Sequence, residues 1–363
     1  MNKSFLAIII LAATVLISCE TDIDANAEYK DIPVVYGLIN PLDSIHYIKV
    51  NKAFSGDANA LDLAADANNY DYKAGEIDVV VQEWNGDNKL NSYTLMRTTN
   101  IPKDAGIFDN STNVLYSFVE PNINESFTYK LIITNNNLNK EITAQTEIVD
   151  TSTVAAPSTG QKFSFFDGDI NNNGEYRERI VSVNSGGDIG RVEAILIFNY
   201  LDVYTIASGK DSVERSVVIS LGEKITPLSA ANSNLDWTLQ GETFFENIAA
   251  SVPPMTADLS HRRLDNISLR FEIAGTELST FMAVSAPSNT INQDKPNYTN
   301  ITNGIGIFSS RKTQLWTSTF IPLGGLVNIT DPTIKYLAFH PSMAGRGFCF
   351  NYGTFPVAPC VRQ

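Results

Sequence analysis

The stretch "RVEAILIFNYLDVYTI", residues 191–206, has apolar residues on both of its alternating faces. A strand with this pattern is covered on both sides, so the stretch predicts the central strand of a β-sheet. It follows a shorter strand-like run, "RERIVSV", and the turn-forming residues "NSGGDIG". The chain from residue 162 onward is therefore expected to form a strand-rich domain.

One helix is expected within this domain, in "GETFFENIAASV" at residues 241–252. Phe244, Phe245, Ile248 and Val252 recur at helical spacing, which places them on one side of a helix. The segment predicts a short helix packed on the sheet, with its aromatic residues in the core rather than at a functional site.

Residues 32–150 contain seven strand-like runs: "IPVVYGLI", "SIHYIKVNKAF", "EIDVVVQEW", "SYTLMRTT", "NVLYSFVE", "SFTYKLIITN" and "EITAQTEIV". Turn residues separate nearly all of them, a spacing typical of an immunoglobulin-like β-sandwich. Residues 55–75 are rich in Ala and acidic residues and predict a surface loop with one helical turn.

A linker is predicted at residues 151–161, where small residues, Pro and Gly occur without a hydrophobic period. A chain of 363 residues exceeds the usual size of a single core, so two domains are expected. The fold prediction is all-β: an immunoglobulin-like sandwich at 32–150, then a larger sandwich-like domain with one short helix at 162–363.

The first residues have the layout of a secretory signal: Lys3, the apolar run "FLAIIILAATVLI", then Ser18 and Cys19. The apolar run is too short to span a bilayer, which needs roughly 20 residues. "LISC" resembles a bacterial lipobox, which implies cleavage of residues 1–18, acylation of Cys19 and a tether at 19–31. The alternative is an uncleaved helical anchor. The lipid chains would attach the protein to a membrane.

The formal net charge is −14. An acidic chain is unsuited to nucleic acid, whose phosphates require a basic surface, and to anionic lipid headgroups. The charge itself is consistent with an ordinary soluble exterior.

The sequence contains no G-x-S-x-G elbow, no G-x-x-x-x-G-K-[ST] loop and no G-x-G-x-x-G fingerprint. Its histidines, His46, His261 and His340, are far apart and have no neighbours at metal-ligand spacing. Carboxylate pairs such as Glu175 and Glu178 suit glycoside hydrolysis, but similar pairs are common in a chain with 40 acidic residues. The sequence therefore favours a binding protein that is not an enzyme, with an extracytoplasmic hydrolase acting on glycans as the alternative.

Asp169, Asn171 and Asn173 precede Gly174 in "DINNNGEYRE", like the opening of a calcium loop. Position twelve is Ile180, however, and Glu178 comes two residues too early for the final ligand. Asn-Gly between two strand-like runs is also a signal for a hairpin without metal. Calcium held by Asp169, Asn171, Asn173 and Glu178 is the tentative cofactor prediction, and the plain hairpin is the favoured alternative.

Two modifications are predicted. Cys349 and Cys360, eleven positions apart, are expected to form a disulfide in an oxidising compartment, with free buried thiols as the alternative. "DSI" at Ser44 and "DSV" at Ser212 resemble acceptors of the Bacteroidota O-glycosylation system. Exposed strand ends are the alternative for these serines.

"NQDKPNYTNITNGIGIFSSR" at 292–311, the lipobox, "VVYGLINPLDSIHYIKVNKAF" at 34–54 and "YLAFHP…GFCF" at 336–350 together resemble a family of Bacteroidota surface lipoproteins of unknown function. The resemblance implies an outer-membrane, surface-exposed lipoprotein. It also implies a TonB-dependent receptor or an extracellular polymer as partner, and no catalytic residues.

The 292–311 stretch also predicts a structural lock. Gly304 and Gly306 are expected at tight backbone contacts. Ile305, Ile307 and Phe308 are expected in the core. Arg311 is expected to be buried against a carboxylate or carbonyl groups.

Overall fold

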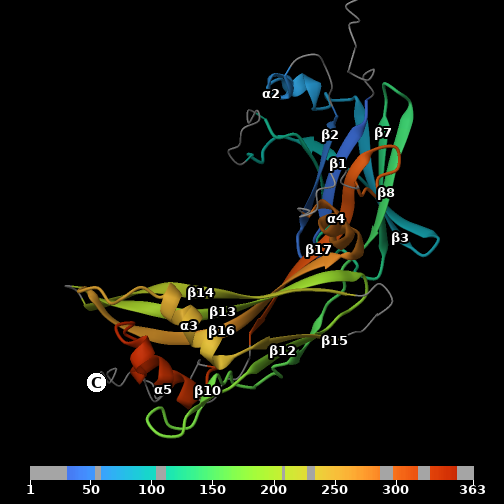
Figure 1. The fold of residues 1–363 in the computed structure, drawn as a ribbon. Helices are drawn as coiled ribbons and strands as arrows, with labels where there is room; N and C mark the ends of the chain where they lie inside the picture. The colour runs from blue at the N-terminus through green and yellow to red at the C-terminus, as the bar shows by residue number, and fades with distance from the viewer. Residues whose placement is uncertain are drawn as a thin grey trace, which may run out of the picture.

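The computed structural model describes residues 31–53, 59–103, 112–206, 209–226, 234–286, 297–317 and 328–349. These residues form two β-rich halves that meet at an angle (Figure 1). The all-β prediction is confirmed. Among the helices of these ranges, none combines the length and the apolar character needed to cross a lipid bilayer.

The upper half in Figure 1 is a sandwich of two sheets. One contains β1 (Pro33–Ile39), β2 (Ile45–Lys52), β6 (Leu115–Val119) and β5 (Met96–Thr98). The other has the order β4 (Asn88–Thr94), β3 (Ile77–Asn85), β7 (Thr128–Asn135) and β8 (Lys140–Glu147). Alternate residues of each strand fill the space between the sheets. In β2, for example, His46, Ile48 and Val50 are buried and alternate with Ile45, Tyr47 and Lys49 on the opposite face.

The lower half is built on three long antiparallel strands, β13 (Ile189–Ile206), β14 (Gly209–Ile225) and β16 (Leu259–Gly275). β13 lies between the other two, as its apolar sequence predicts. A second core separates these strands from β9 (Thr153–Ala156), β12 (Arg179–Asn184) and β15 (Asn234–Leu239). The hairpin of β10 (Phe166–Asp167) and β11 (Glu175–Tyr176) adjoins this core.

Short helices complete the fold. The predicted helix is α3 (Gly241–Ser251), with Phe244, Phe245 and Ile248 buried and Val252 buried just after its end. The predicted turn in the 55–75 loop is α2 (Ala60–Ala64), followed by the 3-10 turn η1 (Ala67–Asn69). Three further elements were not predicted: α4 (Thr276–Ser285), α5 (Asp331–Phe339) and η2 (Pro341–Met343).

β17 (Ile305–Thr317) belongs to both halves. Its first part, from Ile305 to Ser310, pairs in parallel with β1, and its second part, from Arg311 to Thr317, pairs antiparallel with β16. One eight-stranded sheet therefore runs through the molecule in the order β14-β13-β16-β17-β1-β2-β6-β5.

The expected domain limits differ from this arrangement. Ile301 and Phe308 pack in the core of the upper half, although they lie far beyond residue 150. The expected linker at 151–161 contains β9, in which Val154 pairs with Val183 of β12. The composition of the segment suggested a linker because small residues and Pro dominate it, yet Val154 packs on the lower core.

Candidate binding surface

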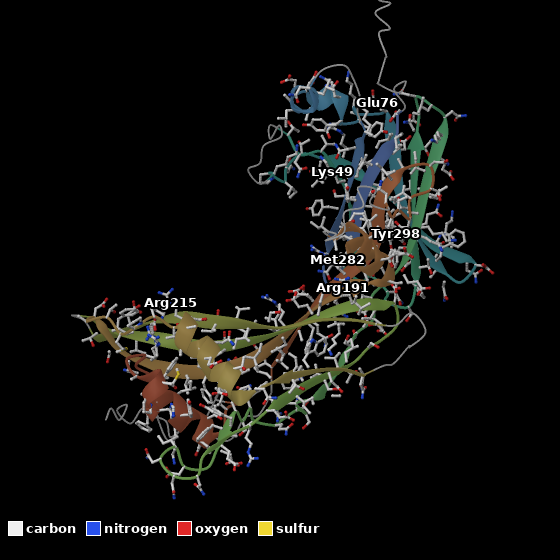
Figure 2. All side chains as sticks on the ribbon, in the orientation of Figure 1. Lys49, Glu76, Arg191, Arg215, Met282 and Tyr298 are labelled. Carbon is white, nitrogen blue, oxygen red and sulfur yellow. The ribbon has the colours of Figure 1, made fainter. Side chains whose placement is uncertain are left out.

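The eight-stranded sheet turns one face toward the two cores and the other toward the inside of the angle between the halves (Figure 1). We call the second face the elbow face. In the upper half it carries Tyr36, Ile45, Tyr47, Met96 and Val119, which alternate with core residues along their strands. In Figure 2, Lys49 lies in the upper half, Met282 near the bend and Arg215 in the lower half.

Helix α4 covers the elbow face at the bend. Ser309 Oγ of β17 accepts a hydrogen bond from the backbone N–H of Leu278 at 3.1 Å. Ser279 Oγ donates to the carbonyl of Gly190 at 3.0 Å. Ser309 is fully buried beneath the helix, while Met282 on α4 remains 40 % exposed.

Beyond α4, the upper half of the elbow face is apolar and uncovered by described residues. Ile45 pairs with Val119, and Tyr47 and Met96 lie on either side of Ser117, so the four apolar side chains share one face across three strands. Exposure runs from 37 % at Tyr47 to 75 % at Met96. Single exposed apolar residues need no explanation, but a contiguous group of aromatic, Met and branched residues marks an interaction surface.

The patch continues onto α4 through an edge-on contact between the rings of Tyr36 and Phe281, with centroids 6.5 Å apart.

Lys49 provides a positive charge beside this patch, opposite Tyr36 on the neighbouring strand. Its Nζ donates to the carbonyl of Val114 at 2.9 Å and to Asn113 Oδ1 at 3.3 Å, and lies 3.6 Å from Asp71 Oδ1. Burial lowers the pKa of Lys49, and the nearby Asp71 carboxylate partly opposes this shift. The lysine is thus held in place by three oxygen partners rather than extended into solvent.

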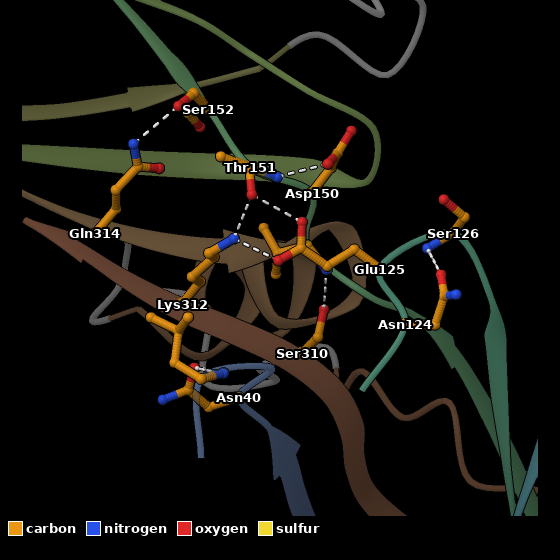
Figure 3. Close-up of polar contacts among 12 residues, drawn as sticks. Asn40, Asn124, Glu125, Ser126, Asp150, Thr151, Ser152, Ser310, Lys312 and Gln314 are labelled. Atoms are coloured by element: carbon orange, nitrogen blue, oxygen red, sulfur yellow. Dashed lines mark hydrogen bonds and ion pairs between the residues drawn. The ribbon is translucent and has the colours of Figure 1, made fainter. Parts of the chain in front are cut away.

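A polar network fixes the angle between the halves (Figure 3). Lys312 Nζ on β17 lies 2.5 Å from Glu125 Oε1 of the upper half and donates to Thr151 Oγ1 at 2.7 Å. Thr151 Oγ1 in turn donates to Glu125 Oε2 at 2.9 Å. The Lys312 side chain is only 5 % exposed. A buried ion pair closed by a third partner gives the junction a defined geometry.

The same strand makes two more contacts with the connecting segment. Ser310 Oγ accepts from the backbone N–H of Val149 at 2.9 Å, and Gln314 Nε2 donates to the carbonyl of Ser152 at 2.8 Å (Figure 3). Every second residue of β17 from Ser310 to Gln314 therefore bonds to residues 149–152 or to Glu125.

These contacts correct two predictions about 292–311. Arg311 is exposed, and its neighbour Lys312 is the buried cation, because β17 turns its even-numbered residues toward the connecting segment. Ile305 is 46 % exposed, whereas Ile307 and Phe308 are buried as predicted. The predicted close approach at Gly306 is confirmed: its φ is +117°, and a Cβ atom there would overlap the Val35 carbonyl.

An acidic hollow of about 250 Å³ lies beside the junction, with Glu125, Glu147, Asp150 and Asp188 among its lining residues. Burial raises the pKa of Asp188 to about 6, and the neighbouring Glu147 adds to the shift. The Asp188 Oδ2 atom is buried and has no hydrogen-bond partner among the described residues.

The residues of the tentative calcium site lie in and just after a hairpin that is stabilised by hydrogen bonds and packing within the protein. Asp169 Oδ1 accepts from the backbone N–H of Asn171 at 2.8 Å, and Glu178 accepts from Gln240 Nε2 at 3.2 Å. Gly174 lies beneath the Phe166 ring, where a Cβ atom would overlap it. The predicted hairpin is therefore present as β10 and β11. Within the described ranges, no group of three His, Cys, Asp or Glu residues is placed to hold a metal ion.

The remaining predicted residues are dispersed. Ser44 and Ser212 are exposed, and their glycosylation stays a prediction. Cys349 is buried and disulfide-bonded. The predicted acylation of Cys19 and the predicted pairing of Cys360 concern residues outside the described ranges. The role of Asn173 as a calcium ligand stays a prediction.

Sequence reasoning did not identify the elbow face as a site. Alternation along the sequence separates Ile45 and Tyr47 from His46, Ile48 and Val50, but it does not show that Met96 and Val119 lie on the same face as Ile45 and Tyr47. No protein-family model and no curated protein matches this sequence.

Proposed function

We propose that this protein is a lipid-anchored binding protein of the outer membrane that holds a partner protein on the upper half of the elbow face, without catalysing a reaction. The observation that carries the proposal is the set of exposed apolar side chains on one face of neighbouring strands: Tyr36, Ile45, Tyr47, Met96 and Val119. Aromatic and Met side chains at the centre of a patch are typical of protein interfaces.

The fixed angle between the halves supports this function. Because Lys312, Glu125 and Thr151 hold the junction, the elbow face keeps its shape before a partner arrives. A preformed surface loses little conformational entropy on binding. The signal-like N-terminus and the resemblance to surface lipoproteins support the membrane location and a TonB-dependent receptor as the partner.

The test is co-purification from detergent-solubilised outer membranes with the tagged full-length protein. We expect the double change Tyr47→Glu with Met96→Glu to reduce receptor recovery at least tenfold, because two carboxylates would have to be desolvated in the interface. Leu90→Glu is the matched control, since Leu90 is 48 % exposed on β4 of the opposite sheet. Equal recovery by both variants, or no receptor bound by the unmodified protein, would contradict the proposal.

A further inference from the structure

Within the described ranges, the longest strand at the edge of a sheet is β14, which ends the eight-stranded sheet beside β13 (Figure 1). β14 has 17 residues, whereas β5 at the other end of the same sheet has three. An edge strand presents backbone N–H and C=O groups that have no partner in its own sheet, so it can pair with a strand of another chain. β14 is therefore a candidate for extension of the sheet.

The first part of β14 is open along this edge. Between residues 210 and 220, the backbone bonds to no described residue outside β13, except at one position. There the N–H of Ser212 donates to the neighbouring Asp211 Oδ1 at 2.8 Å. The pairing with β13 is regular over the same residues, so the open edge is straight enough to pair with a second strand.

A β-bulge closes the remaining part of the edge. Leu221 has no partner on β13, because the pairing shifts between Ala194 and Ile195. The carbonyl of Gly222 also accepts a hydrogen bond from Trp237 Nε1 at 2.9 Å. Bulges turn an edge away from pairing with other chains. The available edge thus ends before this bulge.

The edge of β8 shows how the protein covers another of its strands. Thr143 of β8 pairs with Thr302, and Asn303 Nδ2 donates to the carbonyl of Glu141 at 2.9 Å. β8 thereby has a segment of its own chain along its edge. Residues 210–220 have no such segment among the described residues.

A second copy of the chain can occupy the open edge of β14. Two identical strands related by a two-fold axis pair antiparallel, and the contact is the same on both copies. Along a regular strand, successive residues direct their backbone groups to opposite edges, so paired residues must be separated by an even number of positions. The two-fold axis must therefore pass through a residue and not between two residues.

Side-chain charges select the position of this axis. An axis at Asp211, Glu214 or Arg215 would place a charge directly opposite its own copy, which is unfavourable. An axis at Val213 places Asp211 opposite Arg215 of the second copy, and symmetry repeats this pair. An axis at a serine of this edge gives neither Asp211 nor Arg215 a charged partner. The sequence of β14 is thus complementary to itself about Val213.

The side chains of this register are accessible. Val213 is 38 % exposed, and the side chain of Arg215 is 51 % exposed. Both lie on the same face of β14 as Asp211, because alternate residues of a strand share a face. Residues 209–217 of the two copies would face one another over about 30 Å.

We propose that two copies of this protein pair antiparallel through β14 about Val213, so that their eight-stranded sheets become continuous. Residues that face each other across a strand pair point to the same side of the sheet, so both elbow faces lie on one side of the dimer. The pairing goes beyond the proposed partner binding and does not depend on it, because no residue of the apolar patch lies on β14.

The first test is chemical cross-linking of the full-length protein, purified in detergent, with a short reagent that joins two thiols. Val213→Cys lies on the proposed axis, where the Cβ atoms of the two copies are about 5 Å apart, so we expect a cross-linked dimer. Val218→Cys is the matched control. Val218 is 56 % exposed on the same strand but lies beyond the paired residues, so it should give at least tenfold less dimer.

The second test is a charge placed on the axis. Val213→Lys sets two ammonium groups opposite each other, so light scattering of the full-length protein should give the mass of one chain, whereas the unmodified protein gives the mass of two. Val218→Lys is the control and should keep the mass of two chains. Thermal unfolding followed by circular dichroism should be alike for the two lysine variants.

The proposal is overturned if Val213→Cys is cross-linked no more strongly than Val218→Cys, or if Val213→Lys has the same mass as the unmodified protein. Cross-linking of Val213→Cys in intact cells to a different protein, in place of a second copy, would assign the edge to that protein and would also overturn it.

Discussion

Arg262 and Asp202 form a buried ion pair in which Nε lies 2.7 Å from Oδ1, with side-chain exposures of only 2 % and 7 %. The same guanidinium donates through Nη1 to the carbonyl groups of Pro253 and Arg346. The backbone of Arg262 also bonds to Gly347 and Cys349. One residue thus joins the long strands of the lower half to residues 346–349.

Removing one member of this pair is expected to lower the free energy of unfolding. Arg262→Met leaves the Asp202 carboxylate in a buried site with only the more exposed Arg215, so we expect a loss of about 3 to 5 kcal/mol in the free energy of unfolding. Urea denaturation measures this loss. Arg215→Ala removes the exposed partner of the same carboxylate and should lower the free energy of unfolding far less. Similar losses in both variants would contradict the assignment.

Gly306 is the position where the β1–β17 pairing tolerates no side chain. Gly306→Ala combines a positive φ with overlap against the Val35 carbonyl, so we expect a loss well above 1 kcal/mol. Gly86→Ala is the comparison, because Gly86 also has a positive φ but no heavy atom within 4 Å of the added Cβ. Gly86→Ala should lower the free energy of unfolding by about 1 kcal/mol. The melting temperatures should rank Gly306→Ala clearly below Gly86→Ala.

The raised pKa of Asp188 predicts that the stability of the protein depends on pH. Its pKa is raised from 3.8 to about 6, so the native state binds the proton more tightly than the unfolded chain does. The resulting stabilisation is complete below pH 4 and is lost as the pH rises through 6. Asp188→Asn should remove this dependence, and Asn tolerates the positive φ of 48°.

The expected difference is about 1 kcal/mol between pH 5 and 7.5, after allowance for the partial exposure of Asp188. Urea midpoints of both proteins across this range measure it. Parallel pH profiles for the unmodified protein and Asp188→Asn would exclude the effect.

Cys349 is disulfide-bonded, and we predict that its partner is Cys360. Closing a loop of about 12 residues should contribute about 3 kcal/mol through the entropy of the unfolded chain, a loss expected for Cys360→Ser. Intact mass after thiol alkylation without reduction decides the pairing. Alkylation of both cysteines in the unmodified protein would refute it.

Lipidation at Cys19 is tested by metabolic labelling with a fatty-acid analogue. Cys19→Ala should abolish the label and leave uncleaved precursor, because the acylated cysteine is the expected first residue of the mature chain. A label of unchanged strength in Cys19→Ala would rule out this anchor.

Local patterns predicted the elements whose environment is set by their own sequence. Phe244, Phe245 and Ile248 indicated α3 because helical spacing alone places them on one side. β13 was evident because both of its faces are apolar. Neither prediction required knowledge of a distant partner.

Residues whose burial depends on distant segments were not predicted. Arginine is usually exposed, so the sequence around Arg262 does not indicate burial. Its burial depends on Asp202 and on carbonyl groups at positions 253 and 346. Lys312 was overlooked in favour of Arg311 because the direction of each β17 side chain is set by pairing with β1 and β16.

The shared strand β17 also governs the order of folding. Val34 near the start of the chain pairs with Ile305, so β1 has an open edge until almost the whole chain has emerged. Pairing over such a sequence separation is slow, and an unpaired edge invites association with other chains. A chain that crosses a membrane before it folds would therefore need protection throughout its export, and truncation before residue 305 would leave β1 permanently unprotected on that side.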